Sequence, residues 1–207
     1  MPLSSAPVRR PLIVATHNPG KLREFRALLA GLPFDLRGLE ELGVASPDES
    51  GASFLENAML KARHAAAAQG AAAIADDSGL EVDALGGAPG IYSARYAGPG
   101  ADDAANNAKL VRALAGTPAA RRAARYRCVL VFVAGAADAS PLIAEGVWEG
   151  LIVDSPRGAG GFGYDPYFWL PDLGLTAAQL EPGEKNRLSH RGSAMRALRS
   201  RLLACTP

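Results

Sequence analysis

Acidic residues, glycines and turn formers concentrate in one stretch of the chain, residues 75–98, which opens with Ala-Asp-Asp-Ser-Gly. The apolar run at residues 71–75 directly before it has the composition of a buried strand. We therefore expect this strand to end at the acids, with the chain turning at Ser78 and Gly79. Because sites in α/β folds form where strands end, residues 75–98 are predicted to be the chemical centre of the protein.

The two adjacent acids, Asp76 and Asp77, are expected to serve different purposes. Successive side chains of a strand point to opposite faces, so only one carboxylate can easily face a given cleft while the other braces a loop or turn. A second interpretation fits the same residues. In an Asx-turn both carboxylates would accept hydrogen bonds from nearby backbone N–H groups, and Asp-Asp-Ser-Gly is also an ordinary turn composition. The pair alone leaves both interpretations open.

A second group of candidate residues follows the first predicted strand, residues 12–16. The loop His-Asn-Pro-Gly-Lys at residues 17–21 comes next, and apolar residues then recur at helical spacing. A glycine-containing loop at a helix N-terminus offers backbone N–H groups and a positive dipole end to an anion, and Lys21 adds a charge. The natural ligand would be phosphate, whereas the alternative is an ordinary turn with a solvated lysine. The loop is not a Walker A motif, because Leu22 replaces the Ser or Thr that binds magnesium.

A third group lies in a loop rich in glycine and aromatic residues, residues 158–171, which contains Gly-Phe-Gly-Tyr-Asp-Pro at 161–166. Glycine permits close backbone approach and an adjacent ring offers a stacking face, which together suit a planar base. The alternative is a folded loop whose aromatic side chains fill the core. These residues alone favour neither interpretation over the other.

The remaining sequence predicts the elements that would position these residues. Ser53 and Glu56 match a capping box at the start of an amphipathic helix that ends at Gly70. Residues 125–133 change from alternating to uniformly apolar, as a central strand does, and a hairpin partner follows at 142–154. Further predicted segments are a strand within 34–42, a helix at 101–115, and a C-terminal helix with Met195, Leu198 and Leu202 facing inward.

The bulk composition bounds the class of protein. The chain has 207 residues, 48% hydrophobic and 21% charged, which predicts a soluble globular protein of one domain or one domain with a lobe. A net charge of +1 provides no basic field for nucleic-acid binding, and the longest apolar run is too short to span a membrane. The two cysteines, Cys128 and Cys205, form no zinc or CxxC motif, so we expect a reducing, cytoplasmic location.

Five motifs occur together and in order along the chain. They are Thr16-x-Asn18-x-x-Lys21, Ser-Phe-Leu-Glu-Asn-Ala-Met-Leu-Lys-Ala at 53–62, the stretch 75–98, Gly-Phe-Gly-Tyr-Asp-Pro at 161–166 and Ser-His-Arg-Gly at 189–192. Any one of them would be weakly specific, but in this register they resemble the inosine triphosphate pyrophosphatase family. These are the Ham1-like enzymes that hydrolyse non-standard purine nucleoside triphosphates. The resemblance extends from about residue 12 to residue 204.

The resemblance implies an α/β fold in which a long mixed β-sheet is flanked by helices and two lobes enclose a nucleotide cleft. It further implies a short N-terminal arm at residues 1–11, a single domain at 12–204 and assembly as a homodimer. The substrate would be a small-molecule nucleoside triphosphate. The reaction would be the Mg²⁺-dependent conversion of ITP, dITP or XTP to the monophosphate and pyrophosphate.

By the same resemblance, each part of the substrate has its own set of residues. The metal site would contain Glu49 and Asp77, and Asp77 would also accept a proton from water. Because two or three carboxylates are the usual ligands of such a metal, Asp76 is a further candidate on chemical grounds. The residues that would hold the triphosphate are Thr16, His17, Asn18, Pro19, Gly20 and Lys21, with Lys61 as a further candidate. Ser78 would lie beside the substrate, and the base and sugar would contact Phe162, Gly163, Tyr164, Asp165, Lys185, His190 and Arg191. His17 stands where the family often has a small residue, which leaves its own role open.

These roles agree with elementary chemistry. A triphosphate carries about four negative charges near neutral pH, which cations must offset before a nucleophile can approach. Hypoxanthine and xanthine present a 6-oxo acceptor where adenine has an amino donor, so donors such as Arg191 would be left unpaired against ATP. Two alternatives remain: a pyrophosphatase for other modified nucleotides, and a non-catalytic nucleotide-binding module. The second would gain little from the carboxylates of Glu49 and Asp77.

Overall fold

The computed structural model describes residues 9–204, so Cys205 lies outside the described residues. Seven strands of the described chain form one sheet in the order β2-β1-β3-β4-β5-β6-β7. Their bounds are β1 Arg10–Val14, β2 Phe34–Gly38, β3 Ala72–Val82, β4 Ala123–Val133, β5 Leu142–Ile152, β6 Phe168–Leu170 and β7 Leu175–Thr176. β1 pairs in parallel with β2 and β3, whereas the pairs from β3 to β7 are antiparallel. The expectation of a mixed sheet is confirmed.

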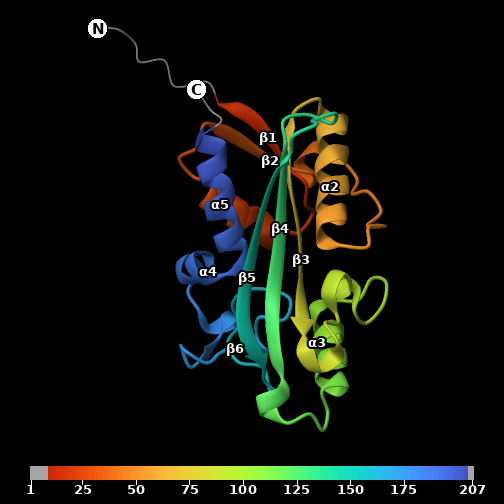
Figure 1. Cartoon of the computed structure of the whole chain (residues 1–207), viewed down its shortest axis with the longest axis vertical. Helices are drawn as coiled ribbons and strands as arrows, with labels where there is room; N and C mark the ends of the chain where they lie inside the picture. Colours follow the sequence, from red (N-terminus) through yellow and green to blue (C-terminus); the bar gives the residue numbers. More distant parts are fainter. Residues whose placement is uncertain (1–8, 205–207) are drawn as a thin grey trace, which may run out of the picture.

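Three strands run the length of the molecule. β3, β4 and β5 have 11 residues each, or about 36 Å at the usual rise of a strand. In Figure 1 they run vertically through both halves of the protein, with β1 and β2 beside them in the upper half. The long strands therefore join two lobes, one that contains β1 and β2 and one that contains β6 and β7.

Helices cover both faces of the sheet. Their bounds are α1 Pro19–Leu28, α2 Phe54–Gln69, α3 Asp103–Ala113, α4 Pro182–Leu188 and α5 His190–Ala204. The alanines of α2 pack on one face, over Ala75 and Val131, whereas α1 and α5 share a core with Ile74 on the opposite face. In the second lobe, Leu110 of α3 and Leu114, which follows the helix, pack with side chains of β6. Figure 1 shows α2 and α3 on one side of the long strands and α4 and α5 on the other.

The prediction that a strand ends at residue 75 is wrong. β3 continues to Val82 because β4 pairs with it in an antiparallel ladder along nearly its whole length. The strand that ends there is β1, whose last residue, Val14, lies opposite Ile74. The two acids that follow in β3 therefore lie beside the end of β1 and within an extended strand, which also removes the Asx-turn interpretation.

The other predicted elements occur, with changes at their ends. The first strand begins at Arg10, and the glycine-rich loop contains the short strand β6. Phe168 of β6 is completely buried in the core, so this part of the loop has the packing role that was the alternative to base binding. Ser53 caps α2 by accepting a hydrogen bond from the Glu56 N–H, as predicted. No helix among the described residues is long and apolar enough to cross a membrane.

The start of α5 lies directly on β5. Gly146 of β5 has no side chain at the point of contact, and a Cβ atom there would lie 2.0 Å from the carbonyl oxygen of His190. Glycine is the residue that allows backbone to approach so closely. The first turn of α5, which carries His190 and Arg191, is thereby held against the sheet.

Candidate active site

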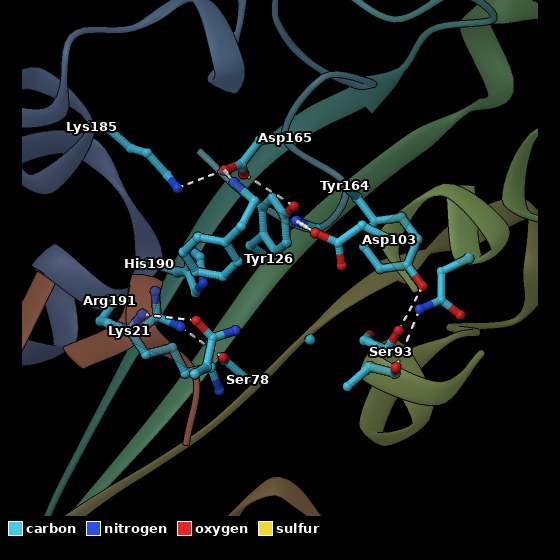
Figure 2. Close-up of a pocket in the computed structure, with 16 residues that line it drawn as sticks. Lys21, Ser78, Ser93, Asp103, Tyr126, Tyr164, Asp165, Lys185, His190 and Arg191 are labelled. Carbon is cyan, nitrogen blue, oxygen red and sulfur yellow. Dashed lines mark hydrogen bonds and ion pairs between the residues drawn. The ribbon is translucent and has the colours of Figure 1, made fainter. Parts of the chain in front are cut away.

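A cavity opens where α1, β3, α3 and α5 meet the glycine-rich loop (Figure 2). It lies beside the end of β1, where α1 turns to one face of the sheet and α2 covers the other, and such points are where open α/β sheets bind ligands. The structure brings ten of the residues predicted from the sequence into its lining. They are Asn18, Lys21, Ser78, Phe162, Gly163, Tyr164, Asp165, Lys185, His190 and Arg191.

Asp76 holds two cations of this cavity on one face of β3. Arg191 donates from Nε to Asp76 Oδ2 at 3.0 Å, and Lys21 forms an ion pair with Oδ1. The same guanidinium donates to Ser78 Oγ at 2.9 Å and pairs with Glu24 of α1. Burial alone would raise the pKa of Asp76, but Arg191 and Lys21 outweigh it and hold that pKa well below its usual value. Asp76 is therefore a buried anion that fixes α1 and α5 to β3.

Asp77 is directed to the other face of β3, as expected for adjacent strand residues. Lys61 of α2 donates to Asp77 Oδ1 at 2.6 Å and to Glu49 Oε1 at 3.0 Å. Asn57 donates to Asp77 Oδ2 at 3.3 Å, and Arg95 donates to Glu49 Oε2 at 2.7 Å. The carboxylates of Glu49 and Asp77 thus converge on one ammonium group. This cluster lies outside the lining of the cavity, on the α2 side of the same strand.

The pKa values of the two carboxyl groups in this cluster shift in opposite directions. Burial is the largest influence on Asp77, and it raises the pKa of that carboxyl above its usual value although Lys61 acts in the opposite direction. Burial also acts to raise the pKa of Glu49, but Lys61 and Arg95 outweigh it, and the net shift is downward. The protein therefore shifts Asp77, and not Glu49, toward the pKa range of a proton acceptor.

Two carboxylates that meet at one cation also suit a divalent metal. Mg²⁺ is usually bound by one or two carboxylates, while substrate phosphates and water complete its shell. Among residues 9–204, no group of three or more acidic, histidine or cysteine side chains is placed to hold a metal. Glu49 and Asp77 fit the role of a two-carboxylate site. Asp76 does not, because its side chain lies on the opposite face of β3, where it pairs with Lys21 and Arg191.

Aromatic rings and cations gather on the side of the cavity formed by the glycine-rich loop. Lys185 Nζ lies 4.5 Å from the ring centre of Phe162, and the Arg191 guanidinium lies 5.8 Å from it. His190 stacks on Tyr126 with the ring centres 4.7 Å apart. Burial, and then the charge of Arg191, hold the pKa of His190 well below its usual value, so the imidazole is neutral at pH 7.

Asp165 connects the glycine-rich loop to β4 and α4 in this wall of the cavity. It accepts hydrogen bonds from the Phe162 N–H at 2.9 Å, the Tyr126 hydroxyl at 3.2 Å and Lys185 Nζ at 2.6 Å. Tyr164 is buried and donates to the carbonyl oxygen of Ser93 at 2.7 Å. Both side chains line the cavity, but their polar atoms are engaged within the protein.

The first loop departs from the sequence expectation. Asn18 caps α1 by accepting hydrogen bonds from the N–H groups of Gly20 and Lys21, at 2.8 and 3.1 Å. These two backbone donors are therefore already paired, and the loop presents the Asn18 and Lys21 side chains to the cavity instead. Its other predicted residues do not line the cavity: Thr16, His17, Pro19 and Gly20.

Several residues that shape the site were not predicted. Glu24 pairs with Arg191 and lies 3.3 Å from Lys185 Nζ. It follows Gly20 by one helical turn, so its position beside the loop could be inferred from α1 alone. Asn57 and Arg95 lie inside motifs at 53–62 and 75–98, but only the fold brings them to Asp77 and Glu49.

Comparison with known proteins adds independent findings. The sequence matches the Ham1 family over residues 12–201. It is 57% identical to the dITP/XTP pyrophosphatase of Methylococcus capsulatus, over 96% of this chain and 99% of the relative. It is also 57% identical to the dITP/XTP pyrophosphatase of Thioalkalivibrio sulfidiphilus, over 92% and 97% of the two chains. Among solved structures, the HAM1 protein of Coxiella burnetii matches with a TM-score of 0.87 and 44% identity, over 95% of this chain and 100% of that one.

The ion pairs of Asp76 generate a prediction for stability. Asp76→Asn keeps the shape of the side chain but leaves Lys21 and Arg191 without their buried anion, so we expect a loss of about 3–5 kcal/mol at pH 7. The folded-state pKa of Asp76 lies below its unfolded value, so its contribution is complete above the unfolded pKa and is lost as pH falls through the folded pKa. The difference between wild type and variant should therefore shrink below about pH 4.

Urea unfolding of both proteins between pH 3 and pH 8 measures this difference. Asp35→Asn is the control, because Asp35 forms an exposed ion pair with Arg37 and should unfold close to the wild-type midpoint. An Asp76→Asn protein as stable as wild type at pH 7 would show that this anion does not hold the site together.

Proposed function

The chain belongs to the Ham1 family, and we propose that it is a dITP/XTP pyrophosphatase that hydrolyses non-canonical purine nucleoside triphosphates. Its products would be the nucleoside monophosphate and pyrophosphate. One observation carries the proposal: Glu49 and Asp77 meet at Lys61 on the strand that also borders a cationic cavity with an aromatic wall. This arrangement offers one place for phosphate chemistry and an adjoining place for a base.

The phosphate end of the site would be formed by two lysines and the two carboxylates. Lys21 and Lys61 bind neighbouring acids of β3, so both ammonium groups lie close to the same point of the strand. Together with the positive end of α1 they would offset much of the triphosphate charge. Glu49 and Asp77 would hold Mg²⁺, which when bound neutralises phosphate oxygens and orients them for displacement.

Asp77 would accept the proton of the attacking water. Its pKa is raised by burial, which makes the carboxylate a better base than an exposed aspartate. Asn57 and Lys61 fix both oxygens of this carboxylate, so its orientation is set before a nucleotide arrives. Arg95 and Lys61 do the same for Glu49. The proposed acid pair is therefore preorganised by side chains of the protein.

The base would stack on Phe162, beside Lys185, His190 and Arg191. A guanidinium has five N–H groups, and three hydrogen bonds of Arg191 go to Asp76, Glu24 and Ser78. Arg191 Nη2 also lies 3.0 Å from Asp76 Oδ2, so one N–H group remains for the 6-oxo group of hypoxanthine or xanthine. The 6-amino group of adenine would place N–H against N–H, which leaves both donors unpaired and disfavours ATP.

The proposal predicts the outcome of a substrate panel. We expect fast, Mg²⁺-dependent release of pyrophosphate from ITP, dITP and XTP, and slow release from GTP and ATP. Pyrophosphate and orthophosphate should be measured for each nucleotide, and for dUTP, with and without Mg²⁺. Faster turnover of a modified pyrimidine triphosphate would favour the alternative pyrophosphatase, and nucleotide binding without turnover would favour a non-catalytic module.

The role of Asp77 gives a second prediction. Asp77→Asn preserves the shape of the side chain but cannot accept a proton, so kcat for dITP should fall by at least about a hundredfold. The affinity for IMP, measured by calorimetry, should stay within about threefold of wild type, because the proposed base contacts are untouched. Asp138→Asn is the matched control, since Asp138 lies in an exposed turn far from the cavity lining and should turn over normally. Near-normal turnover of Asp77→Asn would remove Asp77 from the mechanism.

We also propose a homodimer in the cytoplasm, where its nucleotide substrates are used. The resemblance to the family supports the dimer, and exposed apolar side chains are available for an interface, namely Leu55, Leu60, Tyr92 and Val147. Light scattering coupled to size exclusion should give twice the mass of one 21.4 kDa chain. A particle of single-chain mass at micromolar concentration would contradict this assembly.

A further inference from the structure

We propose that Asp103 and Asn107 of α3 are positioning residues for the purine base, because together they hold both backbone groups of Gly163 in the wall of the cavity. The inference rests on the proposed function in one respect: it takes the loop at residues 162–165 as the part of the site that faces the base. Neither residue touches the cluster of Glu49, Lys61 and Asp77.

Two hydrogen bonds from α3, one to each backbone polar group of Gly163, form what we call the clamp. Asp103 Oδ2 accepts a hydrogen bond from the Gly163 N–H at 2.6 Å, and Asn107 Nδ2 donates to the Gly163 carbonyl oxygen at 2.9 Å. Asn107 Nδ2 also donates to the Asp103 carbonyl oxygen at 2.8 Å, so both of its hydrogens meet carbonyl acceptors and its amide orientation is fixed. Asn107 is buried, whereas the Asp103 carboxylate lines the cavity. Figure 2 shows Asp103 beside Tyr164, across the cavity from Lys21 and Arg191.

The clamped segment needs an external support. Gly161 and Gly163 have φ values of 73° and 64°, a region that other residues rarely enter, and glycine backbone has the most conformational freedom to lose. Between them, Phe162 packs so closely on the first loop that a Cβ atom at Gly20 would lie 2.8 Å from its ring. Gly163, which follows Phe162, is therefore held by α3 of the second lobe, while the Phe162 ring packs against Gly20 of the first lobe.

The clamp acts on one end of the site only. The residues proposed to bind phosphate and metal come from α1, α2, β3 and the segment before α2, whereas Asp103 and Asn107 come from α3 in the second lobe. Loss of the clamp would free Gly163 and misplace the Phe162 ring, which weakens ligands that carry a base. Ligands that consist of phosphate alone should be bound as before. A general loss of folding would weaken both kinds of ligand.

The test compares two products as ligands, IMP and inorganic pyrophosphate, by calorimetry in Mg²⁺. We expect Asp103→Ala and Asn107→Ala each to raise the Kd for IMP about tenfold, the effect of one hydrogen bond of ordinary strength, and to leave that for pyrophosphate within about twofold. With dITP, KM should rise and kcat should change little. Asp103→Asn retains an oxygen that can accept from the Gly163 N–H, so it should bind IMP within about threefold of wild type.

Asp102→Ala is the matched control. Asp102 is the neighbouring acid and caps α3 by accepting from the Ala105 N–H at 2.8 Å, but it does not line the cavity. Its loss should lower the melting temperature without changing the Kd for IMP. If Asn107→Ala does not fold, Asp103→Ala and Asp103→Asn still carry the test, because that carboxylate lies on the surface of the cavity.

Two results would overturn the inference: wild-type affinity for IMP in both alanine variants, or an equal loss of affinity for IMP and pyrophosphate. A wild-type protein that does not bind IMP would instead overturn the proposed function. The wild-type measurement therefore separates failure of the positioning role from failure of the function on which it rests.

Discussion

The rest of the site depends on a single buried carboxylate, that of Asp76. An anion removed from water is tolerated only where cations and hydrogen-bond donors surround it, and here they are Lys21 and Arg191. These residues lie in α1 and α5, at opposite ends of the chain, so satisfying one charge brings both helices to the same point of β3. The cations that border the cavity are thus held in place by the protein itself.

The extended conformation of β3 separates two kinds of chemistry. Because neighbouring side chains point to opposite faces, Asp76 supports the cavity on the α5 side while Asp77 meets Lys61 and Glu49 on the α2 side. Both acids follow Ile74, the residue of β3 that lies opposite the last residue of β1.

The sequence predicts those features that depend on local patterns. The capping of α2 by Ser53 and the central strand β4 follow from spacing alone. The opposite directions of Asp76 and Asp77 are one of two interpretations that the sequence leaves open, and the pairing of β3 with β4 decides between them. The length of β3 does not follow from spacing, because the antiparallel pairing that prolongs it depends on β4, some fifty residues later. The same holds for three polar residues whose roles depend on partners distant in the sequence, namely Glu24, Arg95 and Asn107. Nothing in their local sequence distinguishes them from ordinary surface residues. The family resemblance supplied the proposed roles at the cavity, which spacing could not.

The three long strands have a mechanical consequence. β3, β4 and β5 pass through both lobes without interruption, so no flexible linker within the sheet separates one lobe from the other. Any change in the width of the cleft must bend or twist a hydrogen-bonded ribbon, and the resistance to such motion is shared over many bonds. The sheet therefore bends as one elastic element instead of rotating about a hinge. Its stiffness is set by residues far from the proposed nucleotide site, and it limits how far the two lobes can separate at the cleft.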